Sequence, residues 1–313
     1  MTPPWHTQTP AVLGLDIGTT GIRLLELSGN PTACRVNRYA YVPYPAALTD
    51  QAISTCIQHA LKRSGTKTRL AALAIPNAES ITKSISLPAG LSGHELLARV
   101  ELEADQHLPY TLDELYWDFT VKESSTDSTD PKEILVVASQ RAYVEDRIAL
   151  AERAGLQVKL VDMERYAMEN AMRSQYARSG HACERLAVLY IEGETSRFTL
   201  FHPQEHTSAH ELRAGVNTHT DAPFDDLIKA IQRILKTHGS KPVTGIERLV
   251  LAGEISAWPE LKPCLETAFN IPTEHANPLI GMNMESIENR ELLKQNAPAF
   301  LIASGLALRV FDP

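Results

Sequence analysis

The chain has 313 residues, of which 43% are hydrophobic and 22% are charged, and it carries a net charge of −8. This length and balance are typical of a globular protein with about two domains. The acidic excess disfavours nucleic acid as the main partner, because phosphate recognition needs concentrated lysine and arginine. The four cysteines are far apart and form no C-x-x-C pair, which argues against a zinc site or a disulfide framework and favours a reducing cytoplasm.

Two segments bear on membrane association. The first residues, "MTPPWHTQTP", lack the charged and then apolar pattern of a signal peptide. The longest apolar run, about 299–308, is too short to span a bilayer. We therefore expect a cytoplasmic protein that reaches a membrane only through a partner.

The first part of the chain predicts an α/β arrangement. "LGLDIGTTGIRLLEL" (13–27) reads as an apolar strand, a turn rich in glycine and threonine, and a second strand. Residues 50–65 carry an apolar stripe at helical spacing and end at Gly65, which predicts an amphipathic helix with a glycine cap. Two further strands are predicted on either side of this helix, at 34–44 and 69–76.

Residues 79–155 have a different pattern, typical of a compact α+β module inserted in the first domain. Three strands and two helices are predicted there, at 82–88, 92–109, 114–123, 133–140 and 141–155. Ser92 and Glu95 have the spacing of a capping box at the start of the first of these helices. The polar stretch 124–131 is expected to be a connection without core residues.

The rest of the chain repeats the opening design. "RLAVLYIEGETSRFTLFH" (185–202) again reads as an apolar strand, a short polar turn and an alternating strand. It follows a strand and a helix at 158–172, for which Asp162 is the expected N-cap. The later elements are a helix capped by Gly239, a buried strand, a second helix and a largely buried helix, at 225–239, 246–256, 259–272 and 296–311. Two halves that each begin with strand–turn–strand indicate an internal duplication.

The first turn has the residues of a phosphate grip. "DIGTTG" offers Gly18 and Gly21 for close backbone approach and Thr19 and Thr20 as hydroxyl donors, and Asp16 is placed to hold a water on Mg²⁺. The motif is neither a P-loop nor a Rossmann turn. A plain hairpin, whose glycines only satisfy turn geometry, explains the isolated motif equally well. The repeated turn and the late apolar strand that ends in glycine resemble the layout of the actin, Hsp70 and sugar-kinase class, which implies a cleft between two similar domains that closes on ATP and Mg²⁺.

Five segments, in order over most of 11–310, give the chain a specific resemblance. They are "GLDIGTTGIRLLEL", "SISLP…ELEADQHLPYTLDELYWDF", "ILVVASQRAYVEDRIALAERAGLQVKLVDMERYAMENAM", "LVLAGEISAWPELKPCLETAFNIPTEHANPL" and "NAPAFLIASGLALR". On these segments the chain resembles the PilM family of type IV pilus assembly proteins, which are actin-like relatives of the cell-division protein FtsA. The resemblance implies an α/β, actin-like ATPase fold with two duplicated ribonuclease-H-like domains and an FtsA-type inserted subdomain.

The resemblance also implies domain limits and partners. The expected domains are 11–184, with the inserted module at about 79–155, and 185–295; a C-terminal helix in 296–313 returns to the first domain. Family members are cytoplasmic, bind ATP and dock the N-terminal cytoplasmic tail of the inner-membrane protein PilN, in a groove expected between the first subdomain and the inserted module. Self-association through the module is a further expectation, and no nucleic acid is implied.

The residues of the implied nucleotide site depart from the family pattern. The site residues are Asp16, Gly18, Thr19, Thr20, Arg23, Thr195, Gly253 and Glu254, with Asp16 as the Mg²⁺ residue. Arg23 replaces the usual lysine, which keeps the charge with a different geometry. Tyr190 stands at the second carboxylate position, Glu192 at a glycine position, and Glu254 at a glycine position of the adenosine segment. Carboxylates aimed at phosphates repel them, so we expect weak ATP binding or none. Two alternatives for Glu192 stay open: it ligates a cation, or it points away from the phosphates.

The sequence therefore predicts a cytoplasmic actin-like scaffold of the type IV pilus inner-membrane complex, or of a related competence or secretion system. It would dock a PilN-like tail, with a degenerate nucleotide cleft and no efficient ATPase activity. Two alternatives stay open. One is an active ATPase that couples nucleotide state to partner binding. The other, less favoured, is a sugar-kinase-like enzyme, for which no sugar-binding acid is evident.

Overall fold

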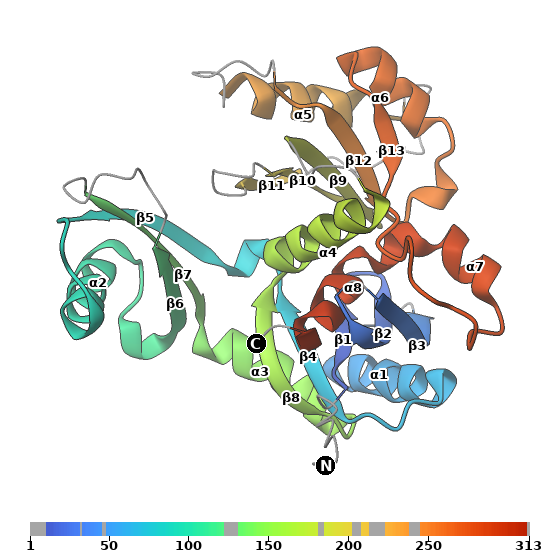
Figure 1. The fold of residues 1–313 in the computed structure, drawn as a ribbon, viewed down its shortest axis with the longest axis horizontal. Helices are drawn as coiled ribbons and strands as arrows, with labels where there is room; N and C mark the ends of the chain where they lie inside the picture. The colour runs from blue at the N-terminus through green and yellow to red at the C-terminus, as the bar shows by residue number, and fades with distance from the viewer. Residues whose placement is uncertain are drawn as a thin grey trace, which may run out of the picture. The chain divides into compact units, whose positions relative to one another are not determined.

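The computed structural model divides into two compact units, a larger one formed by 1–74 and 150–313 and a smaller one formed by 75–149 (Figure 1). The residues that the structure describes are 11–31, 33–45, 48–121, 131–180, 185–201, 208–212, 223–237 and 245–311.

The first half of the larger unit contains a five-stranded sheet in the order β3-β2-β1-β4-β8. Its strands are β1 (Leu13–Ile17), β2 (Gly21–Asn30), β3 (Ala33–Pro43), β4 (Leu70–Ile75) and β8 (Gln157–Met163). The strands β1, β2 and β3 pair antiparallel, whereas β4 runs parallel to β1. Helix α1 (Asp50–Ser64) packs on one face; Thr49 accepts the first-turn N–H of Ala52, and Gly65 ends the helix in a left-handed conformation.

The second half of the larger unit repeats this sheet in the order β11-β10-β9-β12-β13. Its strands are β9 (Leu186–Glu192), β10 (Thr195–Phe201), β11 (Ser208–Leu212), β12 (Arg248–Gly253) and β13 (Thr273–His275). The first three again pair antiparallel, and β12 runs parallel to β9. Helices α5 (Asp225–Thr237) and α6 (Leu261–Phe269) pack on one face of the sheet. The strand–turn–strand duplication expected from the sequence is therefore present.

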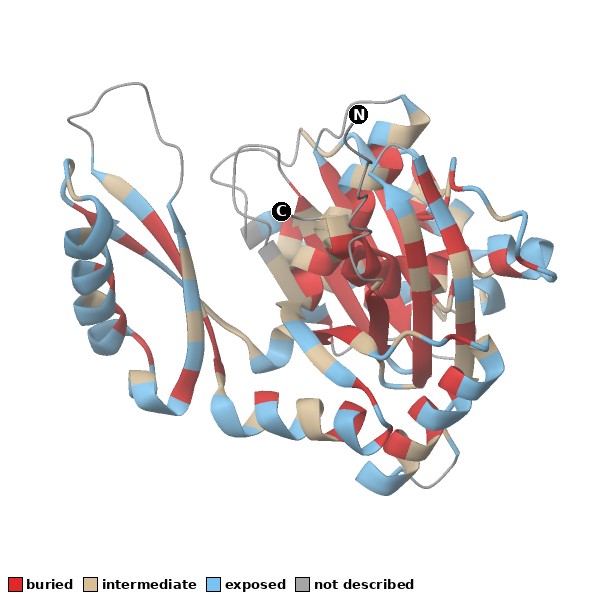
Figure 2. Cartoon of the chain, turned by 60° about the horizontal axis from the view of Figure 1, so that its bottom comes forward, coloured by how far each residue is buried: buried red, intermediate tan, exposed pale blue. Residues whose placement is uncertain are grey.

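A shared core joins the two halves of the larger unit. Helices α4 (Glu164–Ser179) and α8 (Leu301–Leu308) pack with β4, β9 and β12 in one hydrophobic cluster, and all eight residues of α8 are buried. Gly305 is required there, because a Cβ at this position would lie 1.7 Å from the carbonyl oxygen of Ala167. Figure 2 shows how continuously the central strands of this unit are buried. Such burial needs the near-continuous apolar runs that the sequence has in these strands.

The smaller unit is a three-stranded antiparallel sheet with one helix on its face. The order is β5-β7-β6, with β5 (Ile81–Leu87), β6 (Leu115–Val121) and β7 (Lys132–Gln140), and α2 (Gly93–His107) covers one side. Alternate residues of β6, beginning at Leu115, face that core, as the sequence pattern predicts. Helix α3 (Arg141–Arg153) begins in this unit and ends in the larger one.

Several local expectations need correction. Asp162 is not the N-cap of α4; Met163 holds that position, and the Asp162 carboxylate instead accepts a hydrogen bond from Arg309, 2.7 Å away. Ser92 is the N-cap of α2, but its side chain makes no capping bond. A capping box is formed instead by Thr111 and Glu114, at the separate 3-10 helix Leu112–Glu114. Short elements missed by the periodicity are β11, β13 and α7 (Arg290–Gln295). Most of the predicted polar connection (124–130) and Gly239 lie outside the described residues.

Within the described part of the chain, no helix has the length and apolar character needed to cross a membrane.

Candidate functional site

The two duplicated turns of the larger unit meet at one place. The first turn joins β1 to β2 at 18–20, and the second joins β9 to β10 at 193–194. Thr20 of the first turn has its hydroxyl 3.3 Å from Oε1 of Glu192, the last residue of β9. A Cβ at Gly193 would come within 3.0 Å of the Thr20 methyl group. The space between the halves is therefore closed by contacts between the turns themselves.

Arg23 is the centre of this contact. Its side chain is completely buried, and its guanidinium lies 3.5 Å from Asp16, 2.6 Å from Glu192 and 2.9 Å from Glu254. The sheet register explains its position, since Arg23 pairs with Asp16 on β1 and with Tyr41 on β3. Buried guanidinium groups need such partners, because an unpaired buried charge is strongly destabilising.

Glu192 is bound on both of its oxygens. Oε1 accepts from Arg23, and Oε2 accepts from Arg197 at 2.9 Å. The backbone N–H of Thr19, in the first turn, also helps to lower the pKa of this carboxylate. Burial alone would raise the pKa of Glu192, but the charges of Arg23 and Arg197 lower it below its ordinary value. Glu192 is therefore an ionised carboxylate at neutral pH.

Arg197 extends the cluster to helix α4. It donates to Glu164, the first residue of that helix, as well as to Glu192, and both pairs are buried. Its place could have been read from the sequence, because Arg197 follows Tyr190 at the same seven-residue spacing that separates Arg23 from Asp16. The register matches too: Asp16 pairs with Arg23, and Tyr190 pairs with Arg197.

Asp16 differs from Glu192 in the direction of its pKa shift. Burial raises its pKa to about 7, and this effect outweighs the nearby charge of Arg23. Its Oδ2 atom is buried, and no hydrogen-bond partner for it lies among the described residues. A carboxyl held this way is partly protonated near neutral pH, so it is a poor anchor for a hydrated Mg²⁺ ion.

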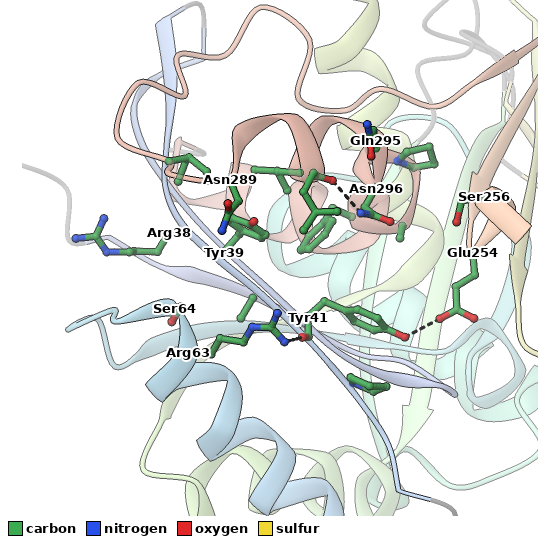
Figure 3. Close-up of a pocket in the computed structure, with 18 of the residues that line it drawn as sticks. Arg38, Tyr39, Tyr41, Arg63, Ser64, Glu254, Ser256, Asn289, Gln295 and Asn296 are labelled. Atoms are coloured by element: carbon green, nitrogen blue, oxygen red, sulfur yellow. Dashed lines mark hydrogen bonds between the residues drawn. The ribbon is translucent and has the colours of Figure 1, made fainter.

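Glu254 reaches the cluster from the end of β12. Gly253 has a φ of 84°, and a Cβ there would lie 2.0 Å from the carbonyl oxygen of Ile191, so the turn requires glycine. One oxygen of Glu254 accepts from Thr20 at 2.7 Å, from Arg23 at 2.9 Å and from the Tyr41 hydroxyl at 2.9 Å. The Tyr41–Glu254 bond is drawn in Figure 3.

A cavity of about 1050 Å³ lies beside Glu254 (Figure 3). It is lined by β3, the end of α1, the turn after β12 and the segment 286–300, all within the larger unit. Arg63 closes one side by donating to the carbonyl oxygen of Tyr41 at 3.0 Å. The lining mixes aromatic, amide and charged side chains of both signs, so it does not by itself select one class of ligand.

These residues do not fit the triphosphate and Mg²⁺ expected for a cleft of this kind. Oε1 of Glu192 lies 2.1 Å from the position of a Cβ on Gly18, so the space that glycine leaves open is already filled. The Thr20 hydroxyl and Arg23 are both engaged by carboxylates. A phosphate would meet Glu192 and Glu254 at close range and be repelled. Among the described residues, no group of three or more histidines, cysteines or acids could hold a metal ion.

The structure brings together seven of the eight residues predicted for the nucleotide site. They are Asp16, Gly18, Thr19, Thr20, Arg23, Gly253 and Glu254. The eighth residue, Thr195, makes a local contact: its hydroxyl donates to the carbonyl oxygen of Glu192 within the second turn. The sequence pattern did not single out Glu164, Arg197 or Tyr41, which complete the cluster from α4, β10 and β3.

Comparisons with known proteins agree with this architecture. A family model described as type IV pilus assembly protein PilM matches residues 14–222 and 208–311. A solved PilM-PilN type IV pilus biogenesis complex aligns with a TM-score of 0.81 and 22% identity, covering 96% of this chain and 99% of that one. A diol dehydratase-reactivating factor in nucleotide-free form aligns with a TM-score of 0.55 and 8% identity, covering 97% and 100%.

A protein with an actin-like ATPase fold from Bacteroides thetaiotaomicron aligns with a TM-score of 0.48 and 10% identity, covering 89% of this chain and 95% of that one. The duplicated sheets and the alignment over almost the whole chain confirm the α/β, actin-like fold expected from the sequence.

Proposed function

Since the chain belongs to the PilM family of type IV pilus assembly proteins, we propose that it is a cytoplasmic adaptor that docks the N-terminal cytoplasmic tail of a PilN-like inner-membrane protein. The tail brings the adaptor to the inner membrane, where the pilus is assembled. Docking does not require ATP.

The observation that carries this proposal is the extent of the family match. The PilM model accounts for residues 14–222 and 208–311, so both halves and the smaller unit are included. The solved relative that aligns over 96% of this chain is a complex with PilN. A PilN-like tail is therefore the first partner to test.

The filled cleft supports nucleotide independence. Two carboxylates engage the groups that would bind phosphate, and contacts from Arg23 to Glu192 and Glu254 already join the two halves. A docking surface elsewhere on the protein does not depend on those groups. An adaptor of this kind keeps its partner in any nucleotide state of the cell.

The first turn favours one alternative function. Asp16, Gly18 and Thr20 are retained and lie together, as an ATP-binding protein would require. In that alternative, ATP displaces Glu192 and changes the affinity for the partner, which requires that the partner bind the two cleft states differently.

A titration separates these functions. A labelled peptide with the N-terminal cytoplasmic sequence of the PilN-like protein is titrated with the full chain, with and without Mg·ATP, and a scrambled peptide is the control. We expect the dissociation constant to stay within a few-fold on addition of nucleotide, and also in Asp16→Ala. Absence of binding to the peptide would reject the adaptor. An increase in affinity of about tenfold or more on addition of ATP would favour the alternative.

A further inference from the structure

The buried ionic cluster consists of Asp16, Arg23, Glu164, Glu192, Arg197 and Glu254. We propose that Glu192 and Glu254 are internal ligands of the first turn: their carboxylates take the place of a nucleotide's phosphates and hold the two halves of the larger unit closed without nucleotide. The inference deepens the proposed function, on which its biological meaning rests, by naming what replaces ATP in the cleft.

Glu192 and Glu254 engage hydrogen-bond donors that a phosphate would use. A phosphate-binding turn offers backbone N–H groups, short hydroxyls and a cation to an anion with several oxygens. Here Arg23 and the Thr20 hydroxyl both contact Glu192, and both also bind Glu254. Carboxylates and phosphates use the same donors, so the Thr20 hydroxyl and the Nη atoms of Arg23 are already engaged by anions of the protein itself.

Glu192 also fills the space beside Gly18. Gly18 leaves the room that a close approach to phosphate needs, and Glu192 enters that room to within 2.1 Å of the missing Cβ. In the duplicated half, Glu192 itself occupies the position that corresponds to Gly18, two residues after Tyr190 as Gly18 is two residues after Asp16. The first turn thus has the open space at a glycine, and the second turn has the side chain that fills this space.

The same bonds connect the two halves of the larger unit. Arg23 and Thr20 belong to the first half, whereas Glu192 and Glu254 belong to the second, 169 to 234 positions away in the chain. Tyr41 on β3 adds a further bond to Glu254. These bonds run across the cleft in the direction in which a bound nucleotide would join the halves.

The test replaces both carboxylates with glycine, which reopens the space beside the first turn and removes two negative charges. Wild type, Glu192→Gly with Glu254→Gly, and the matched control Glu194→Gly are titrated with Mg·ATP by calorimetry. Glu194 is an exposed glutamate in the same second turn, so its removal changes net charge and glycine content without opening the cradle. We expect no saturation up to about 1 mM for wild type and for the control, and an affinity at least about tenfold higher in the double variant.

A second measurement covers the case in which the double variant does not fold. Backbone amide exchange of the segment 18–21 is followed without nucleotide in wild type, in Glu254→Gly and in Glu194→Gly. We expect protection in wild type and in the control, and faster exchange in Glu254→Gly, because one of the two internal ligands is lost. Glu254 is 30% exposed, so this variant removes no fully buried group.

Either of two results would overturn the inference: micromolar Mg·ATP binding by wild type, or unchanged exchange of 18–21 in Glu254→Gly. Neither measurement uses the PilN-like peptide. Failure of the internal-ligand inference is therefore distinguishable from failure of the adaptor function, which only the peptide titration tests.

Discussion

The two turns of the larger unit have the same backbone plan and opposite chemistry. Each joins antiparallel strands, and each precedes a buried arginine at the same spacing, Arg23 in the first half and Arg197 in the second. The first turn presents donors, whereas the second presents the carboxylate of Glu192. The difference teaches that a duplicated fold maintains its geometry while a few side chains decide whether the space between the halves holds a ligand or is filled by the protein.

The comparison also explains why the cluster persists although buried ion pairs are costly. Desolvation of charges can exceed their mutual attraction, so such a cluster is weak evidence for stability. Removing a central arginine is nevertheless expensive, since it leaves buried carboxylates without compensation. The following predictions change one turn at a time, from the largest expected effect to the smallest.

Replacing the central cation breaks the contact between the turns. In Arg23→Met, Asp16, Glu192 and Glu254 lose their shared partner, and we expect a loss of about 3–5 kcal/mol in the free energy of unfolding. Urea denaturation measures the change. Arg38, an exposed arginine on β3, is the control, because Arg38→Met should change stability by less than about 0.5 kcal/mol. Equal stability of both variants would show that the cluster does not join the halves.

A dependence of stability on pH is expected from Asp16, whose counterpart in the second half is Tyr190. Because burial raises the folded-state pKa of Asp16 from 3.8 to about 7, the folded chain binds more protons than the unfolded chain between these values. Stability from this group is therefore full below about pH 4 and is lost as the pH rises to 7. We expect Asp16→Asn to match wild type near pH 4 and to be more stable at pH 8, on the order of 2 kcal/mol. A stability difference that does not vary with pH would contradict this assignment.

Gly18 gives the smallest and most specific test. A Cβ there meets Oε1 of Glu192 at 2.1 Å and Nη1 of Arg23 at 2.7 Å, both at the ends of flexible side chains. We expect Gly18→Ala to cost about 1 kcal/mol in wild type and clearly less in a Glu192→Ala background. A double-mutant cycle by thermal unfolding measures the coupling. Additive effects would mean that the two positions do not compete for one space.

Much of the local structure could be predicted from residue patterns. The apolar runs of β1, β4, β9 and α8 and the glycine after α1 were recognisable because hydrophobic periodicity and capping are local signals. Among the elements that were missed, β13 with three residues and α7 with six are too short to show a period. Asp162 has the chemistry of an N-cap, but tertiary contact with Arg309 takes its carboxylate elsewhere.

The sequence by itself determined the duplicated actin-like plan and the replacement of a glycine by Glu192 in the second turn. It predicted a conflict between that glutamate and a phosphate, since like charges repel at any arrangement of a closed cleft. Only the tertiary structure decided where the carboxylate goes. Glu192 is paired with Arg23, 169 positions away, and with Arg197 beside it. Through these contacts a carboxylate that would repel a phosphate binds the first half of the unit instead. Contacts over such separations depend on how two sheets meet, which no local pattern encodes.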